Sequence, residues 1–191
     1  MKRVPIAAAP WGGAYRPAAF AVLTRDPEAL VFTLSSAEAE PPARYRELNS
    51  PVYLDSCLEA FFRPWPERPE YLNFEMNANG ALLLQLGPSR RERRFLTPEE
   101  FPGCWPSVCA FREPGGWGVR LRVPFAFLRA AFGVGAEPDP DAMCGNFYKC
   151  GENPRHYLCY APVRTETPDF HRPEFFVPFR GLWNESDGAA F

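Results

Sequence analysis

Proline and glycine interrupt this sequence throughout its length. The chain has 23 prolines and 14 glycines among 191 residues, and they divide it into short segments. Proline breaks helix interiors and glycine weakens them, so long helices are disfavoured. The combined share of the two residues is still below that of disordered chains. The sequence therefore predicts a loop-rich β protein.

Composition predicts one globular domain that covers residues 1–191. Apolar residues make up 46% of the chain, which includes 17 phenylalanines, so a sizeable core is available. The formal net charge is −2, which argues against nucleic acid or an anionic membrane as a partner. The basic run Arg90–Arg94 lies beside turn-forming residues and is interpreted as a solvated loop.

The N-terminus and the cysteines bear on the compartment. The first residues are a poor secretory signal, and no segment has the length of a membrane span, so we expect a cytoplasmic protein. In that compartment the six cysteines are expected to be free thiols, several of them buried. Four possible zinc ligands cluster in the sequence without the short knuckle of structural zinc sites: Cys144, Cys150, His156 and Cys159.

Short strands are predicted along the chain. An early strand covers residues 30–35, and a meander is expected from residues 57–63, 71–79 and 81–87, with Asn79-Gly80 as a hairpin turn. Residues 107–113 and 116–125 form the next pair, and residues 143–150, 156–163 and 174–180 are further strands. The segment from Pro124 to Gly133 begins and ends as a short helix should. This pattern predicts an all-β antiparallel sandwich of jelly-roll-like form with one short helix, with a closed barrel as the alternative.

The strand YLNFEMNANG has an unusual polar face. Its apolar residues alternate with Asn73, Glu75, Asn77 and Asn79, which predicts one face in the core and the other left open. Asparagine is a poor strand former, so this concentration needs a reason. By the same alternation, Glu59 lies on the non-core face of the preceding strand.

Four motifs in order resemble the family 9 carbohydrate-binding modules, in particular their short free-standing branch. The motifs are YLDSCLEAFF, the polar strand, GNFYKCGE and PDFHRPEFF, and they span about two thirds of the chain. The resemblance implies a β-sandwich that binds a mono- or oligosaccharide by clamping a sugar ring between two aromatic rings. It places Tyr53 and Phe170 at the two stacking positions.

The resemblance also implies polar contacts to the sugar. Glu59 matches the acidic residue that hydrogen-bonds sugar hydroxyls, and Asn77 matches an asparagine on the neighbouring strand. The chain departs from the family at two kinds of position. Sugar-binding members can carry an arginine two residues before that asparagine, where this chain has Glu75, and they commonly have tryptophan at the stacking positions, where this chain has tyrosine and phenylalanine. Carboxylates accept hydrogen bonds from hydroxyls, whereas asparagine both donates and accepts, so this face suits the rim of a sugar.

Further residues are candidates for the same site. Asn146 and Tyr148 share one face of their strand, and Lys149 points the other way. His171 and Arg172 flank Phe170 and either reach the ligand or brace the loop. Sugar binding needs no cofactor. A structural calcium in the loop that contains Glu137, Asp139 and Asp141 is an alternative to a solvated loop.

Other functional classes remain open at this stage. Glu59 and Glu75 could form the carboxyl pair of a glycoside-processing enzyme, although a sandwich face is shallow and a non-catalytic binding module is favoured. A haem site would draw on Met76, Met143 and His171, but Met76 points to the core by parity. A protein-interaction module without a small ligand is the third alternative, and the sequence identifies no protein partner.

Overall fold

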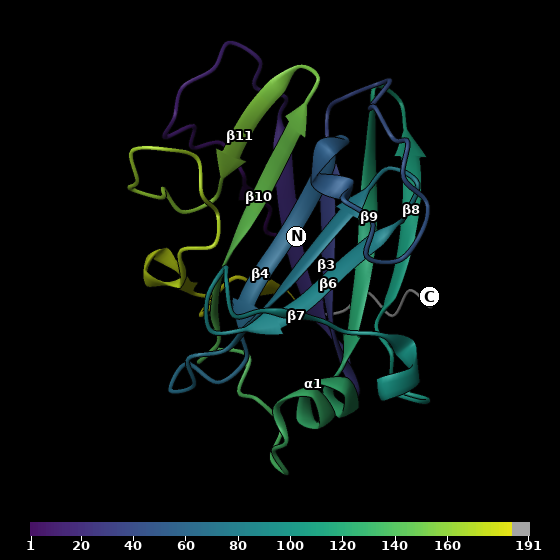
Figure 1. The fold of residues 1–191 in the computed structure, drawn as a ribbon, viewed down its shortest axis with the longest axis vertical. Helices are drawn as coiled ribbons and strands as arrows, with labels where there is room; N and C mark the ends of the chain where they lie inside the picture. The colour runs from purple at the N-terminus through teal and green to yellow at the C-terminus, as the bar shows by residue number, and fades with distance from the viewer. Residues whose placement is uncertain (185–191) are drawn as a thin grey trace.

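The computed structural model describes residues 1–184 and shows two β-sheets packed face to face (Figure 1). The first sheet has six strands: β1 (Val4–Pro5), β2 (Ala19–Arg25), β3 (Ala29–Ser36), β9 (Gly116–Pro124), β8 (Ser107–Glu113) and β13 (Trp183–Asn184), which pairs parallel with β2. The second has seven: β11 (Arg155–Cys159), β10 (Cys144–Glu152), β4 (Cys57–Arg63), β5 (Tyr71–Asn77), β6 (Leu82–Gly87), β7 (Arg94–Phe95) and β12 (Val177–Pro178). The predicted antiparallel sandwich is confirmed, because the sheets share no strand in this part of the chain.

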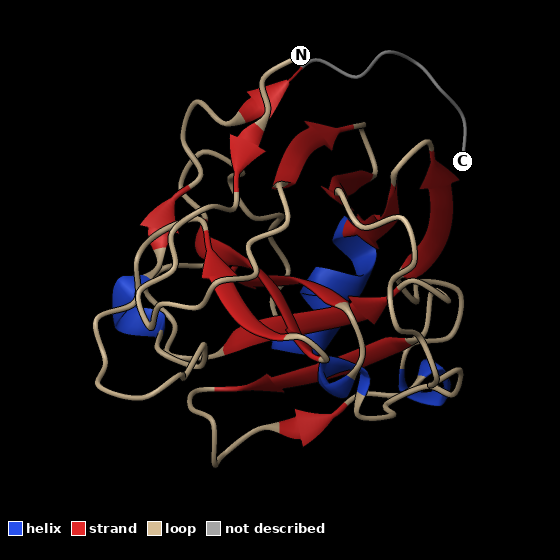
Figure 2. Cartoon of the chain, turned by 90° about the horizontal axis from the view of Figure 1, so that it is seen from above, coloured by secondary structure: helices blue, strands red, loops and turns tan. Residues whose placement is uncertain are grey.

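Helical structure is confined to short segments (Figure 2). The single α-helix of the described chain, α1 (Phe125–Phe132), lies at one end of the sandwich (Figure 1). It follows Pro124 and ends at Gly133, whose φ of 63° is left-handed, as the predicted helix limits require. The 3-10 turns are η1 (Val52–Leu54), η2 (Pro98–Glu100) and η3 (Pro173–Phe175).

The meander β4–β5–β6 forms as predicted and places alternate residues on opposite faces. Leu58, Ala60 and Phe62 of β4 point into the core between the sheets. The ring of Phe62 lies 5.1 Å from that of Phe32 on β3, so aromatic contacts join the two sheets. Met76 also packs in this core.

The structure differs from the predicted strands at two places: one strand was missed, and one predicted strand is mostly a turn. Strand β2 was not predicted, because apolar Phe20 and Val22 stand at the positions between its fully buried residues and hide the alternation. The predicted strand over residues 174–180 is mostly a turn, and only the two-residue strand Val177–Pro178 pairs with β10. Prolines at 173 and 178 each lack the N–H that a longer ladder would need.

An ion pair lies inside the sandwich, on the inner face of β10. Lys149 Nζ is 3.1 Å from Glu38 Oε2 and 2.6 Å from His156 Nε2. The same Glu38 oxygen accepts hydrogen bonds from Ser56 Oγ and Trp117 Nε1. Burial opposes ionisation of Glu38, but Lys149 and these donors outweigh it and lower the pKa of Glu38 to about 2. Lys149 therefore points away from the outer face, as predicted, and forms an ion pair with Glu38 in the interior.

No helix among the described residues is long and apolar enough to cross a membrane.

Candidate functional site

The polar face of β5 is buried, which corrects the expectation of an open face. Asn73, Glu75 and Asn77 are each at most 4% exposed. Loops cover them from outside: Arg93 donates a hydrogen bond to Asn73 Oδ1, and Tyr71 at the start of the strand bonds to His171. The asparagines thus have protein partners, and only part of the face is left for a ligand.

A pocket of about 400 Å³ opens on this outer face of the second sheet. Its floor comes from strands β4, β5, β6, β10 and β11, and its walls from η1, the loop before β7 with Phe95 of β7, and the segment before η3. The lining residues are Tyr53, Leu54, Glu59, Glu75, Leu83, Gln85, Arg90, Arg93, Phe95, Cys150, Glu152, Tyr157 and Pro168–His171. This volume is typical of sites for small ligands.

Two carboxyl groups lie side by side in the floor of the pocket. Glu59 and Glu75 are directly opposite each other in the register of β4 and β5, and they are 2% and 4% exposed. Burial raises the pKa of Glu59 well above its ordinary range, and the charge of Glu75 adds to the effect. Burial also raises the pKa of Glu75, to about 7, although Arg93 and the amide of Asn73 oppose the shift. The floor can therefore accept or donate hydrogen bonds near neutral pH.

The two oxygens of Glu59 differ in their surroundings. Oε1 accepts a hydrogen bond from the Cys150 thiol at 3.1 Å. Oε2 is buried and has no hydrogen-bond partner within the described chain. An unsatisfied buried carboxyl oxygen is costly, so this atom is available to a ligand.

Tyr53 forms an exposed aromatic edge of the pocket. It lies in η1, directly before the floor strand β4, and 46% of its surface is exposed. Phe95 on the short strand β7 is also exposed, at 51%, and lines the pocket. Exposed aromatic rings of this size are suited to ligand contact.

Phe170 and Tyr148 form a stacked pair. Their ring centroids are 4.1 Å apart with planes at 15°, and the Tyr148 hydroxyl donates to the Phe170 carbonyl at 3.1 Å. Phe170 lines the pocket, whereas Tyr148 is fully buried and does not. The structure therefore gives Tyr148 a supporting position beneath Phe170.

Asn77 makes four hydrogen bonds away from the pocket. Its Nδ2 donates to the Tyr45 carbonyl and to Asp55 Oδ2, at 2.8 and 2.9 Å. Its Oδ1 accepts from the backbone N–H groups of Asn79 and Ala81. Asn77 is fully buried, and these bonds hold the β5–β6 turn against the segment between β3 and β4.

Asn146 is buried in the same manner. Its amide donates to the Ala161 carbonyl at 2.8 Å and accepts from the Ala161 N–H at 2.9 Å. It does not line the pocket, and its bonds tie β10 to the segment after β11.

His171 lines the pocket, but Arg172 does not. The His171 ring stacks on Phe61 at 4.8 Å, and its Nδ1 shares a hydrogen bond with the Tyr71 hydroxyl. Burial, together with the charges of Arg93 and Arg90, lowers the pKa of His171 to about 2, so the ring is neutral. Arg172 is paired with Glu174 at 2.6 Å.

The arginine run was interpreted as a solvated loop, and the structure corrects this for the partly buried Arg93, whereas Arg90 stays exposed in the loop. Arg90 and Arg93 line the pocket, where Arg93 Nη1 bonds Asn73 Oδ1 at 3.1 Å and Arg90 pairs with Asp169 at 3.3 Å. Gln85 of β6 was also missed. It stands opposite Asn73 in the strand register, and its polar character within an apolar strand was the available signal.

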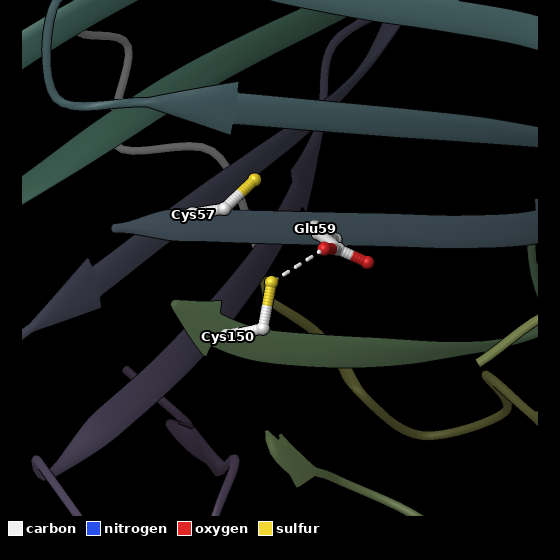
Figure 3. Close-up of side chains that lie close together, drawn as sticks. All are labelled: Cys57, Glu59 and Cys150. Atoms are coloured by element: carbon white, nitrogen blue, oxygen red, sulfur yellow. Dashed lines mark hydrogen bonds between the residues drawn. The ribbon is translucent and has the colours of Figure 1, made fainter. Parts of the chain in front are cut away.

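The possible metal ligands gather in a different way from the sequence cluster. In the described chain all six cysteines are free, and the group of potential ligands that comes together is Cys57, Glu59 and Cys150 (Figure 3). Their ligand atoms lie within 4.8 Å of one another. The calcium loop stays a prediction; in it, Glu137 pairs with Arg129 at 2.6 Å.

Comparison with known proteins places this chain in a family. Residues 2–180 match the sequence profile described as carbohydrate-binding family 9. The crystal structure of a "putative carbohydrate-binding protein" from Bacteroides uniformis is 27% identical with a TM-score of 0.78, and the match covers 92% of this chain and 84% of that one. Among curated proteins, none is significantly similar to this chain.

Two complexes of family 9 modules from Caldicellulosiruptor kristjanssonii share the fold. The glucose complex has a TM-score of 0.59 at 12% identity and covers 97% of this chain and 86% of its own. The cellotriose complex has a TM-score of 0.61 at 13% identity and covers 100% of this chain and 86% of its own. At these identities the likeness establishes the architecture alone.

Proposed function

The chain belongs to carbohydrate-binding family 9, and we propose that it binds a mono- or oligosaccharide, without catalysis, in the pocket between Tyr53 and Phe170. One observation carries the proposal: two buried carboxyl groups form the floor of a pocket that has aromatic rings in its walls. A sugar has apolar C–H faces and a rim of hydroxyls, and these two kinds of surface match the two parts of the pocket. The glucose and cellotriose bound by structurally similar modules support this ligand class.

The aromatic contacts assign roles to the two walls. Tyr53 offers the more exposed ring and stacks against one face of the sugar. Phe170, fixed from below by Tyr148, contacts the sugar from the other side. A pre-positioned ring loses little conformational entropy on binding, which favours affinity.

The polar floor supplies the hydrogen bonds. Glu59 Oε2 accepts from a sugar hydroxyl and thereby gains the partner that it lacks. Glu75, Gln85 and His171 lie around the same pocket and contact further hydroxyls. In this account Tyr148, Asn77, Asn146 and Arg172 support the site and do not touch the sugar.

A titration tests the proposal. The purified protein is titrated calorimetrically with a panel that includes glucose, cellotriose, other neutral sugars and uronic acids, while tyrosine and tryptophan fluorescence is followed. Saturable binding is expected, with at least tenfold weakening in Tyr53→Ala and Glu59→Ala proteins whose circular dichroism is unchanged. Absence of binding by the whole panel at millimolar sugar contradicts the proposal.

The carboxyl pair also favours a second candidate, glycoside hydrolysis. Directly opposed residues on adjacent strands have Cβ atoms roughly 5 Å apart, so rotation of the two side chains can bring their carboxyls to the separation of about 5 Å that a retaining glycosidase uses. A pKa of about 7 for Glu75 suits a general acid. Release of a chromogenic leaving group from aryl glycosides, abolished by Glu59→Gln, identifies the enzyme; no release alongside sugar binding identifies the binding module.

A further inference from the structure

Two thiols and a carboxyl meet on the outer face of the second sheet. Cys57 on β4 and Cys150 on β10 are directly opposite in the strand register, and Glu59 follows Cys57 by two residues on the same face. Figure 3 shows the Cys150 sulfur pointing toward the Glu59 carboxyl between these two strands, with the Cys57 sulfur across the β4 ribbon in this view. The three side chains come from rigid, buried strands and are therefore held in place before any ligand arrives.

The positive charge nearest to the cluster on this face is directed to another residue: Arg93 lies in the same pocket and its charge acts on Glu59, but its guanidinium donates its hydrogen bond to Asn73 Oδ1. Glu59 Oε2 has no hydrogen-bond partner in the described residues, and Oε1 has only the weak thiol donor of Cys150. The nearby Lys149 is on the opposite face of β10, paired with Glu38. A buried acidic group in this state is satisfied by a proton or by a cation.

We propose that Cys57, Glu59 and Cys150 form a binding site for a thiophilic divalent cation, with Zn²⁺ as the ion that fits best. Zinc prefers thiolate sulfur and carboxylate oxygen in tetrahedral geometry. Zinc–ligand bonds of about 2.3 Å to sulfur and 2.0–2.2 Å to oxygen separate neighbouring ligand atoms by roughly 3.5–3.8 Å. In the structure the three ligand atoms lie within 4.8 Å of one another. Side-chain rotations that move these atoms by about an ångström, without movement of the strands, bring them to the separations that zinc requires.

The site has an entry path and an open coordination position. Glu59 and Cys150 line the pocket, whereas Cys57 does not. The three protein ligands leave the fourth position facing the pocket, where water or a hydroxyl of a bound molecule completes the shell. The inference stands whether or not the pocket binds a sugar.

Loading the site exchanges protons for the metal. Each thiol gives up its proton to become a thiolate ligand, and Glu59 gives up its proton where it is protonated, so binding one ion releases two to three protons and changes no oxidation state. Metal affinity is therefore expected to increase with pH.

Cobalt provides a spectroscopic test with the full-length, reduced and chelator-treated protein. Titration with Co²⁺ is expected to give a saturable thiolate-to-metal absorption band at one ion per chain, and Zn²⁺ should abolish this band by displacement. Cys57→Ser and Cys150→Ala each should lower Zn²⁺ affinity at least a hundredfold, and Glu59→Gln at least tenfold. The control Cys159→Ser removes a buried thiol whose Sγ lies against the Ala8 carbonyl, outside the cluster, and should leave the band intact.

Several results would overturn the inference. The first is the absence of a thiolate-to-metal band in the Co²⁺ titration. The second is a band that survives both Cys150→Ala and Glu59→Gln. The third is formation of a Cys57–Cys150 disulfide, in place of metal binding, in reducing buffer. Glu59→Gln keeps the size of the side chain, so it decides the matter if a cysteine variant fails to fold. Sugar titrations in the presence and absence of chelator are read separately, so loss of sugar binding alone does not count against the metal site.

Discussion

Glu59 and Glu75 face each other across β4 and β5, and both are buried in the floor of the pocket. Like charges at opposed positions in a sheet repel each other, and burial adds to the cost of ionising them. Such a pair is an expensive feature for a fold, and a ligand that bonds to it recovers part of the cost.

Stability should depend on pH through Glu75. Its folded pKa of about 7 lies above the ordinary value of 4.5, so between these pH values the unfolded chain loses a proton that the folded chain keeps. The free energy of unfolding therefore falls as pH rises through this window, by roughly 3 kcal/mol at most, and is highest below it. Glu75→Gln should flatten this part of the curve. Urea unfolding of the wild type and of the Glu75→Gln protein from pH 4 to 8 checks this prediction. If the free energy of unfolding changes equally with pH in both proteins, Glu75 is not the group responsible.

Tyr53 should matter for binding and little for stability. Its ring is 46% exposed, so Tyr53→Ala removes contact area for the sugar and leaves the core unchanged. We expect at least a tenfold loss of sugar affinity, equivalent to about 1.4 kcal/mol. Leu48→Ala, at another exposed apolar residue away from the pocket lining, is the control and should bind as the wild type does. Equal weakening by both substitutions would remove Tyr53 from the site.

Asn77 should show the opposite behaviour. Asn77→Ala leaves the N–H groups of Asn79 and Ala81 without their side-chain acceptor and removes one of the donors to the buried Asp55. Each unsatisfied buried group costs about 1–3 kcal/mol, so the free energy of unfolding should fall by about 2–4 kcal/mol. Calorimetry on the folded variant should still give wild-type sugar affinity. A stable variant with weak sugar binding would show instead that Asn77 contacts the ligand.

The interior pair of Glu38 and Lys149 should be essential for stability. Glu38→Gln leaves the Lys149 ammonium buried without its counter-ion, and breaking a buried pair costs about 3–5 kcal/mol. Because the pKa of Glu38 is lowered to about 2, its contribution is present above pH 4.5 and is lost as pH falls towards 2.

A surface pair serves as the control for Glu38. Glu137 forms an ion pair with Arg129, and its side chain is more than half exposed. Glu137→Gln should therefore change the free energy of unfolding by less than about 1 kcal/mol. Denaturant unfolding at pH 7 compares the two substitutions. A similar small effect for both would mean that the interior pair contributes little.

Much of the fold could be predicted from local patterns. The limits of β4 and β8 coincide with the predicted strands, and α1 lies between the predicted proline and glycine limits. These elements have clear alternation or clear terminal residues. Strand β2 has neither, because apolar residues occupy both of its faces.

The site was harder to predict, because loops decide which polar residues are exposed. Period-two alternation correctly placed Glu59 and Glu75 on one face. It could not show that the side-chain amides of Asn77 and Asn146 would be hydrogen-bonded to loop backbones, since those bonds join residues far apart in sequence. For the same reason Arg93 was interpreted as part of a solvated run, although the fold brings its guanidinium to the side chain of Asn73 on β5.

A crystal structure of the protein with the tightest-binding sugar of the panel would show where the sugar lies. We predict a sugar ring between Tyr53 and Phe170, with a hydroxyl within hydrogen-bond distance of Glu59 Oε2. A sugar bound at another surface, with this pocket filled only by water, would contradict the account.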